Sequence, residues 1–179
     1  MASAPPANAT VAMPSSQAGL RHVETPAHSD GRFGGPACRL SRPENKAEWE
    51  AYHLIRRDVL LESFENEFHH PDSDEELEPG HHPLLLWVDD CPVGTVRIDC
   101  LEGGRAAFRL VAIHSEWQGR GYGLRLLQEA ERFASARGCH CAVVYSTPEA
   151  AGFYARAGYI EEAWDDSCMG GIVQMRKPL

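Results

Sequence analysis

The sequence predicts a single-domain mixed α/β (α+β) fold, with a mostly antiparallel central sheet of about six to seven strands flanked by helices. Three observations predict it. Short apolar runs of strand length alternate with segments of helical periodicity. Turn residues at 89–90 and 103–104 join three consecutive strand-like runs. A length of 179 residues with 43% hydrophobic content suits one core.

The N-terminal residues 1–36 are rich in Ala, Pro, Ser and Gly and show no hydrophobic periodicity. Such a segment cannot bury enough apolar surface to offset the entropy of ordering it. We therefore expect a disordered tail over 1–36, or a degenerate targeting segment, and a folded domain over 37–179.

The first elements expected in the domain are a short strand at 37–40 and a helix. Ser41 and Glu44 have the spacing of a capping box and predict where the helix begins. The helix should run to about residue 61 or 64, because its apolar positions keep i, i+3, i+7 spacing: Tyr52, Ile55 and Val59. The polar stretch at 69–82 then predicts a loop that contains a helical turn.

Three antiparallel strands are expected next, at 83–88, 93–100 and 105–113. A helix follows that places Leu126, Ala130 and Phe133 on one face and ends near Gly138. Residues 141–146 are apolar on both faces, as a central strand would be.

The last helix should begin after Thr147, with Pro148 in its first turn, and end at Gly158. Residues 159–164 and 172–177 then predict a terminal pair of strands.

The composition excludes some classes of partner. A formal net charge of −9 and a pI near 5.4 argue against nucleic-acid binding and favour cationic small molecules. No apolar run is long enough to span a membrane, and no signal segment is recognisable, so we expect no membrane partner and a cytoplasmic location. The oligomeric state stays open, with a homodimer among the alternatives.

The six cysteines predict no disulfide framework and no metal site. Cys139 and Cys141 flank His140, but on a strand the two cysteines would share one face while the histidine points to the other. We expect reduced core cysteines and an outward histidine. A site made of the four histidines near residues 69–82 is disfavoured, because adjacent histidines rarely face one ion.

The glycine-rich corner Gln118-Gly119-Arg120-Gly121-Tyr122-Gly123 lies between a strand-like run and a helix. Neither a dinucleotide fingerprint nor a Walker loop fits its spacing. Glycines allow backbone N–H groups to approach an anion, and the helix that begins there adds the positive end of its dipole. The alternatives are a pyrophosphate site and a tight turn without a ligand.

These residues resemble the GNAT acyltransferase superfamily, whose Q/R-x-x-G-x-G/A motif follows the fourth strand. The stretch at 147–162, "TPEAAGFYARAGYIEE", is similar to a later motif of that superfamily, roughly N-x-x-A-x-x-F-Y-x-x-x-G-F. Ala150, Phe153, Tyr154 and Gly158 are in register with it, and Tyr159 replaces the usual Phe. The resemblance covers about residues 37–179.

The resemblance implies a GNAT-like domain that binds acetyl-CoA and transfers its acetyl group to an amine. Main-chain groups of Val111, Ala112 and Ile113 would pair with the pantetheine arm. Tyr154 would protonate the departing thiolate. The glycine corner and the later motif would supply the other residues that contact the cofactor: Gln118, Gly119, Arg120, Gly121, Tyr122, Gly123, Leu124, Thr147, Ala150, Phe153, Tyr154 and Arg156.

The base that deprotonates the amine is less clearly predicted. Many relatives carry a carboxylate on the fourth strand, where this chain has Ala107 and Arg109. Asp99 on the neighbouring strand is a candidate, and its alternative is a surface ion pair with Arg97 or Arg109.

The sequence therefore predicts an acetyl-CoA-dependent N-acetyltransferase acting on a primary amine of a small molecule, by direct attack in a ternary complex. The acids between positions 72 and 78 form either a solvated loop or an acidic rim that attracts a cationic amine. Alternatives are an acyl-CoA-binding sensor without turnover, a transferase for longer acyl groups, and a protein or peptide N-acetyltransferase.

Overall fold

The computed structural model describes residues 37–60, 74–166 and 171–179. The tail expected over 1–36, the end of the first helix at 61–64, and His69 and His70 lie outside the described residues. The described residues form one compact unit.

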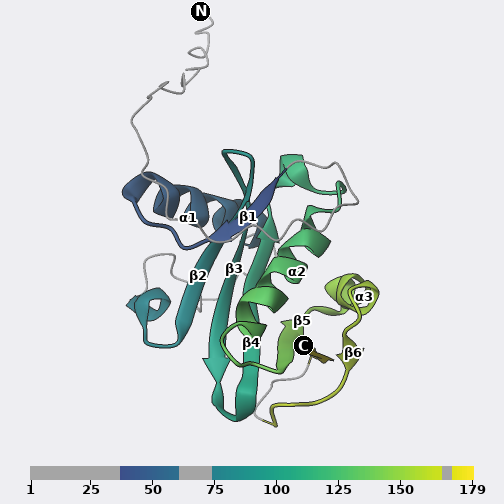
Figure 1. Cartoon of the computed structure of the whole chain (residues 1–179). Helices are drawn as coiled ribbons and strands as arrows, with labels where there is room; N and C mark the ends of the chain where they lie inside the picture. Colours follow the sequence, from purple (N-terminus) through teal and green to yellow (C-terminus); the bar gives the residue numbers. More distant parts are fainter. Residues whose placement is uncertain (1–36, 61–73, 167–170) are drawn as a thin grey trace, which may run out of the picture. The chain divides into compact units, whose positions relative to one another are not determined.

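A single sheet organises the domain (Figure 1), and the described residues contribute seven strands to it in the order β1-β2-β3-β4-β5-β7-β6. All neighbouring strands are antiparallel except β4 and β5, which are parallel. This confirms the predicted fold class. The strands are β1 (Cys38–Ser41), β2 (His81–Val88), β3 (Cys91–Leu101), β4 (Arg105–Ile113), β5 (Cys141–Ser146), β6 (Ile160–Glu161) and β7 (Val173–Pro178).

Three α-helices in the described part of the chain cover the sheet: α1 (Lys46–Leu60), α2 (Tyr122–Ser135) and α3 (Pro148–Arg156). Short 3₁₀ turns are η1 (Asp74–Leu77), η2 (Glu102–Gly104) and η3 (Ser115–Trp117). None of the helices in these ranges is long and apolar enough to span a membrane.

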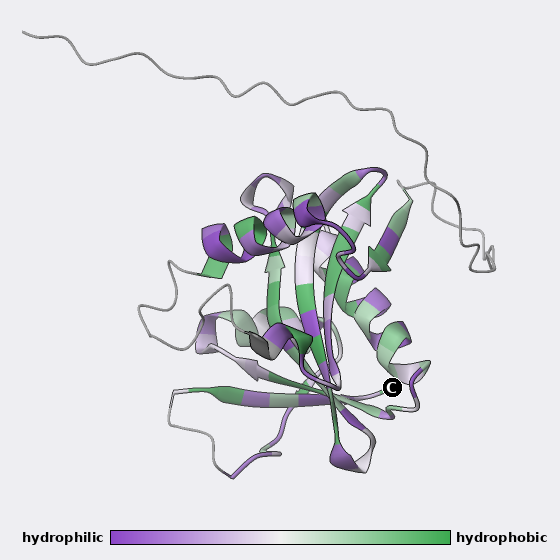
Figure 2. Cartoon of the chain, turned by 90° about the vertical axis from the view of Figure 1, so that its left-hand side faces the viewer, coloured by the Kyte–Doolittle hydropathy of each residue, from purple (hydrophilic) through white to green (hydrophobic). Residues whose placement is uncertain are grey.

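The core has two parts because alternate residues of β2 point to opposite faces of the sheet. Leu84 and Leu86 pack with Leu126 of α2 in the larger cluster. Leu85 packs with Tyr52 of α1 in the smaller one. Hydrophobic segments of the strands lie between the helices (Figure 2), so α1 and α2 cover opposite faces of the sheet.

The N-cap predicted for the first helix, Ser41, was wrong, because the observed N-cap is Asn45, four residues later. Asn45 precedes α1, its Oδ1 accepts from the Glu48 amide at 3.1 Å, and Glu48 Oε2 accepts from the Glu44 amide at 2.8 Å. Ser41 instead ends β1, where its Oγ accepts a 3.0 Å hydrogen bond from Trp87 Nε1. Both positions have capping-box spacing, and the strand pairing of Ser41 decides between them.

Strand β4 has a bulge near its end. Between the pairs Arg97–Arg109 and Thr95–Ala112, β4 contributes one residue more than β3. Leu110 has a positive φ of 54° there, and its carbonyl accepts from the Thr95 hydroxyl at 3.4 Å. A bulge bends its strand and increases the local twist.

The pairing of β4 with β5 ends just before that bulge. It runs from Arg105–Cys141 to Phe108–Val144 and includes no later residue of either strand. The β5-facing main chain of β4 beyond Phe108 therefore has no strand partner within the described sheet.

Candidate active site

The glycine corner turns the chain from η3 into α2. Gly119 and Gly121 have φ of 72° and 86°, and Gly121 is the N-cap of α2. Side chains rarely adopt these angles, so both positions favour glycine. The first amides of α2 follow directly, and such amides have no partner inside their own helix. The corner therefore presents N–H groups at the positive end of a helix of 14 residues.

Gln118 ties this corner to β4. Its side-chain Nε2 donates to the carbonyl oxygen of Ile113 at 2.9 Å. The donor that was expected to hold a pyrophosphate is thus used to position the loop in this structure.

Gly123 brings α2 and α3 together. A Cβ placed there would lie 3.0 Å from the Phe153 ring and 4.0 Å from the Ile113 side chain. Only glycine permits this approach without a shift of the ring. The contact places the later motif of α3 beside the glycine corner and the end of β4.

The end of β4 has side chains on both faces of the sheet. Ile113 is buried and Val111 half-buried against the α2 side, whereas Ala112 is buried in the α1-side cluster. Their main chain lies beyond the last β4–β5 pair. The structure therefore brings the predicted strand segment and the glycine corner together.

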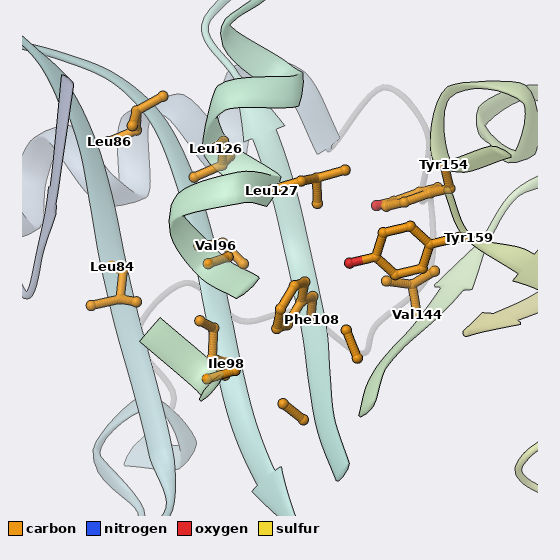
Figure 3. Packing of buried hydrophobic residues seen from close by; sticks show 14 of the residues in the cluster. Leu84, Leu86, Val96, Ile98, Phe108, Leu126, Leu127, Val144, Tyr154 and Tyr159 are labelled. Carbon is orange, nitrogen blue, oxygen red and sulfur yellow. The ribbon is translucent and has the colours of Figure 1, made fainter. Parts of the chain in front are cut away.

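Tyr154 lies in α3 with 7% of its surface exposed. Its ring contacts those of Phe153 and Tyr159 at centroid distances of 5.1 and 5.6 Å. Figure 3 shows its hydroxyl directed toward Leu127 of α2. Burial raises the pKa of Tyr154 to about 12, so the phenol keeps its proton at neutral pH.

The remaining residues that were predicted to contact the cofactor differ in their burial and in their contacts. Thr147 caps α3, because its side chain accepts from the Ala150 amide at 3.3 Å. Ala150 is half-buried against the larger core cluster. Arg120 lies over the Trp117 ring, and Tyr122 meets the edge of that ring. Leu124 and Arg156 are exposed.

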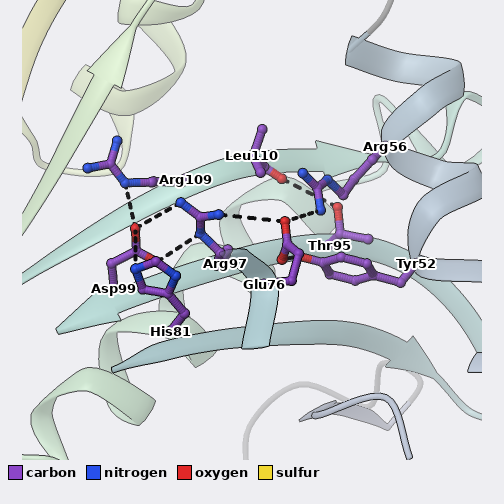
Figure 4. A network of polar contacts seen from close by, with 9 residues as sticks. All are labelled: Tyr52, Arg56, Glu76, His81, Thr95, Arg97, Asp99, Arg109 and Leu110. Atoms are coloured by element: carbon purple, nitrogen blue, oxygen red, sulfur yellow. Dashed lines mark hydrogen bonds and ion pairs between the residues drawn. The ribbon is translucent and has the colours of Figure 1, made fainter. Parts of the chain in front are cut away.

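Asp99 is buried in a network of ion pairs on the sheet face opposite α2 (Figure 4). Arg97 donates to both of its oxygens at 2.9 and 3.1 Å, and Arg109 Nε donates to Oδ2 at 2.6 Å. His81 Nε2 lies 3.8 Å from Oδ2. The arginine pairing that was expected as the alternative to a general base is therefore present. It is buried, whereas a surface pair was expected, and it involves both Arg97 and Arg109. These donors occupy the oxygens that a general base would use.

Glu76 is also buried, and this corrects its predicted place in an acidic rim. Its carboxylate accepts from the Tyr52 hydroxyl at 3.0 Å and from Arg56 Nη1 at 2.6 Å. Arg97 Nη1 lies 3.6 Å from Oε1. These pairs tie η1 to α1 and β3, so Glu76 is not presented to a substrate.

Among residues 37–60, 74–166 and 171–179, no group of three or more His, Cys, Asp or Glu residues is placed to hold a metal ion. His81 and His82 begin β2, where they pair with Asp99 and Ile98.

A cluster at the end of β5 was missed by sequence reasoning. Tyr145 is the first β5 residue beyond the last β4–β5 pair. Its ring lies 4.5 Å from that of Trp164, its hydroxyl contacts the Asp165 carboxylate, and the Arg109 guanidinium lies 5.4 Å from its ring centroid. Gln174 Oε1 accepts from the amides of Trp164 and Asp165 at 2.8 Å each. The only sequence feature that pointed to this cluster was Arg109, which stands on the strand where many relatives carry a carboxylate.

The model of the Acetyltransferase (GNAT) family matches residues 46–159. This range includes the glycine corner, the end of β4 and α3. The chain belongs to the GNAT acetyltransferase family. Membership confirms the predicted family and the enzyme class, an acetyltransferase, and acetyl-CoA is the typical donor of GNAT enzymes.

Individual relatives are more distant. Glucosamine 6-phosphate N-acetyltransferase 1 from Oryza sativa subsp. japonica is 36% identical over 52 residues, which are 29% of this chain and 32% of that protein. The chain thus matches about a third of the length of that curated relative.

Solved N-acetyltransferase structures share the fold at low sequence identity. The PaiA N-acetyltransferase from Thermoplasma acidophilum, solved with coenzyme A, gives a TM-score of 0.60 at 16% identity, over 80% of this chain and 99% of that one. Spermidine N-acetyltransferase from Vibrio cholerae, solved with CoA and spermine, gives a TM-score of 0.62 at 18% identity, over 79% of this chain and 95% of that one. At such identities the likeness concerns the fold.

Proposed function

We propose that this chain transfers the acetyl group of acetyl-CoA to a primary amine of a small molecule, by direct attack in a ternary complex. The observation that carries the proposal is the segment of β4 beyond the last β4–β5 pair, Phe108–Val144, which leads to Ile113 and its hydrogen bond with Gln118 of the glycine corner. Unpaired strand main chain and helix N-terminal amides are what the amide arm and the pyrophosphate of a coenzyme A thioester require.

The cofactor would lie along these two features. Val111, Ala112 and Ile113 would pair with the pantetheine arm like an added strand. Gly119, Gly121 and Gly123 would hold the pyrophosphate, with Gln118 keeping their loop against Ile113. Because Thr147 caps α3, we assign it a positioning role.

The reaction would proceed in one transfer. The neutral amine nitrogen attacks the thioester carbonyl carbon, the carbon–sulfur bond breaks, and the thiolate takes the proton of the Tyr154 hydroxyl. The attacking nitrogen releases one proton to solvent as the amide forms, and the phenolate regains one proton from solvent. A thiolate near pKa 8.5 is a weak base, so acid assistance is helpful without being indispensable.

The proposed mechanism also needs a general base. An alkyl amine with a pKa of about 10 is neutral in only about one molecule in a thousand at pH 7. Asp99 stays a candidate by its place on the sheet face opposite α2. Its hydrogen bonds to two arginines favour a role in holding Arg109 instead.

The relatives are named for acceptors of different charge. They include an amine without an anionic group, spermidine, and a phosphorylated amino sugar. The departure at Arg109 also motivates a second candidate, an acyl-CoA-binding sensor without turnover.

The test is the release of coenzyme A thiol from acetyl-CoA over a broad panel of amines, with acetyl-CoA binding measured in parallel. Amine-dependent release, with formation of the acetamide, supports the transferase. Binding of acetyl-CoA without release for any small amine or peptide would favour the sensor. Release that depends only on peptides would move the acceptor to proteins.

A further inference from the structure

We infer that Arg109 binds an anionic oxygen group of the acceptor, so that the preferred substrate is an amine that also carries a phosphate or a carboxylate. The inference rests on the proposed transferase function and names its substrate class. It reverses the expectation of a cationic amine, which the net charge and an acidic rim had favoured.

The position of Arg109 is the first observation. It is the first β4 residue after the last β4–β5 pair, Phe108–Val144. Phe108 packs under α2, so its neighbour Arg109 points to the opposite face of the sheet. A coenzyme A thioester that entered beyond this pair would bring its reacting end close to that point.

The orientation of its guanidinium is the second observation. The Nε of Arg109 donates a hydrogen bond to Asp99 Oδ2 at 2.6 Å, and the guanidinium lies over the Tyr145 ring. Figure 4 shows its two terminal nitrogens turned away from Asp99. Neither terminal nitrogen donates a hydrogen bond to any of the described residues, and 33% of the side chain is exposed. A guanidinium held by Nε offers its remaining N–H groups as a fork that matches a carboxylate or a phosphate.

Among the described residues, the network that holds Arg109 contains one more guanidinium than carboxylates. Within the described residues, the network in Figure 4 contains three guanidinium groups, from Arg56, Arg97 and Arg109, and two carboxylates, from Glu76 and Asp99. One further carboxylate, that of Asp165, contacts the hydroxyl of Tyr145, whose ring Arg109 lies over. The burial of Glu76 removes one acid that would have attracted a cationic amine.

The test compares matched amines that differ only in the anionic group: glucosamine 6-phosphate with glucosamine, phosphoethanolamine with ethanolamine, and amino acids with their amides. Charge-assisted hydrogen bonds of this kind predict a kcat/KM about 10- to 100-fold higher for the anionic member of at least one pair. The phosphate and carboxylate pairs distinguish which anion is bound. Spermidine serves as the cationic comparison.

Arg109→Gln should reduce that anionic-to-neutral ratio to about one, and Arg109→Lys should keep only part of it because the fork is lost. Arg105→Gln is the matched control. Arg105 lies on the same strand and points to the same face, but its guanidinium donates to the Glu102 and Trp164 carbonyls. The ratio should be unchanged in this variant. Acetyl-CoA affinity and thermal unfolding confirm that each variant is folded.

Each outcome decides a different question. If spermidine or the neutral amines are the better substrates in the wild type, the inference is wrong while the transferase stands. The inference is also wrong if Arg109→Gln lowers kcat/KM equally for every amine. If no amine is acetylated, the proposed function fails as well. Should Arg109→Gln not fold, the wild-type pairs and Arg109→Lys still decide the preference.

Discussion

At the residue scale, the hydroxyl of Tyr154 is the group that the proposed mechanism uses to protonate the departing thiolate. Removing it in Tyr154→Phe keeps the buried ring and its contacts with Phe153 and Tyr159. Because the thiolate can also leave without full protonation, we expect kcat to fall by about 10²-fold, at the low end of general acid effects. Steady-state thiol release with the best amine of the panel measures it.

Tyr159→Phe is the matched control for this change. Tyr159 is also buried, adjoins Tyr154, and is not part of the proposed mechanism. Its variant should keep the wild-type kcat. An unchanged kcat in Tyr154→Phe with every good substrate would remove Tyr154 from the mechanism, and an equal loss in both variants would indicate a packing effect.

At the element scale, the start of α1 depends on Asn45. Its side chain accepts from the Glu48 amide, and such N-cap contacts stabilise proteins by about 1 kcal/mol. We expect Asn45→Ala to lower the free energy of unfolding by about that amount. Urea denaturation followed by circular dichroism measures it.

Glu44 supplies the comparison for this helix. The sequence pattern placed it inside the helix as the partner of Ser41, whereas in the structure it is exposed and precedes the helix. Glu44→Ala should therefore change stability by less than about 0.5 kcal/mol. A larger loss in Glu44→Ala than in Asn45→Ala would support the cap that the sequence predicted.

At the scale of the whole molecule, buried tyrosines couple stability to pH. Burial raises the pKa of Tyr52, Tyr154 and Tyr159 above the ordinary value of 10.0. Their neutral forms therefore contribute stability that is fully present below about pH 10. It is lost as pH rises through the folded-state values, about 12 for Tyr154.

A phenolate absorbance titration checks this coupling. Of the five tyrosines, we expect at least three to ionise only together with alkaline unfolding, as followed by circular dichroism. Ionisation of all five near pH 10 with an intact spectrum would contradict the burial described above. In 6 M guanidinium, as a control, all five should ionise together near pH 10.

The sequence by itself determined the fold class, the extents of β4 and β5, and the start of α3. These follow from local signals: apolar runs between turn residues, and Thr147 followed by Pro148. It also determined the family, because the glycine corner and the α3 motif are contiguous patterns.

Only the tertiary structure decided which polar groups meet. Glu76 bonds Tyr52, which is 24 positions away, and Asp99 is shared by two arginines from different strands. Gln118 turns back to Ile113, and the β4 bulge shifts which residues face α1. A buried polar side chain can hydrogen-bond to several kinds of partner, so the sequence alone does not specify which one it uses. The partner depends on which residues the fold brings within hydrogen-bond distance. The pairing of the sheet thus placed the candidate base Asp99 against Arg109, and an expected rim acid, Glu76, in a buried ion pair.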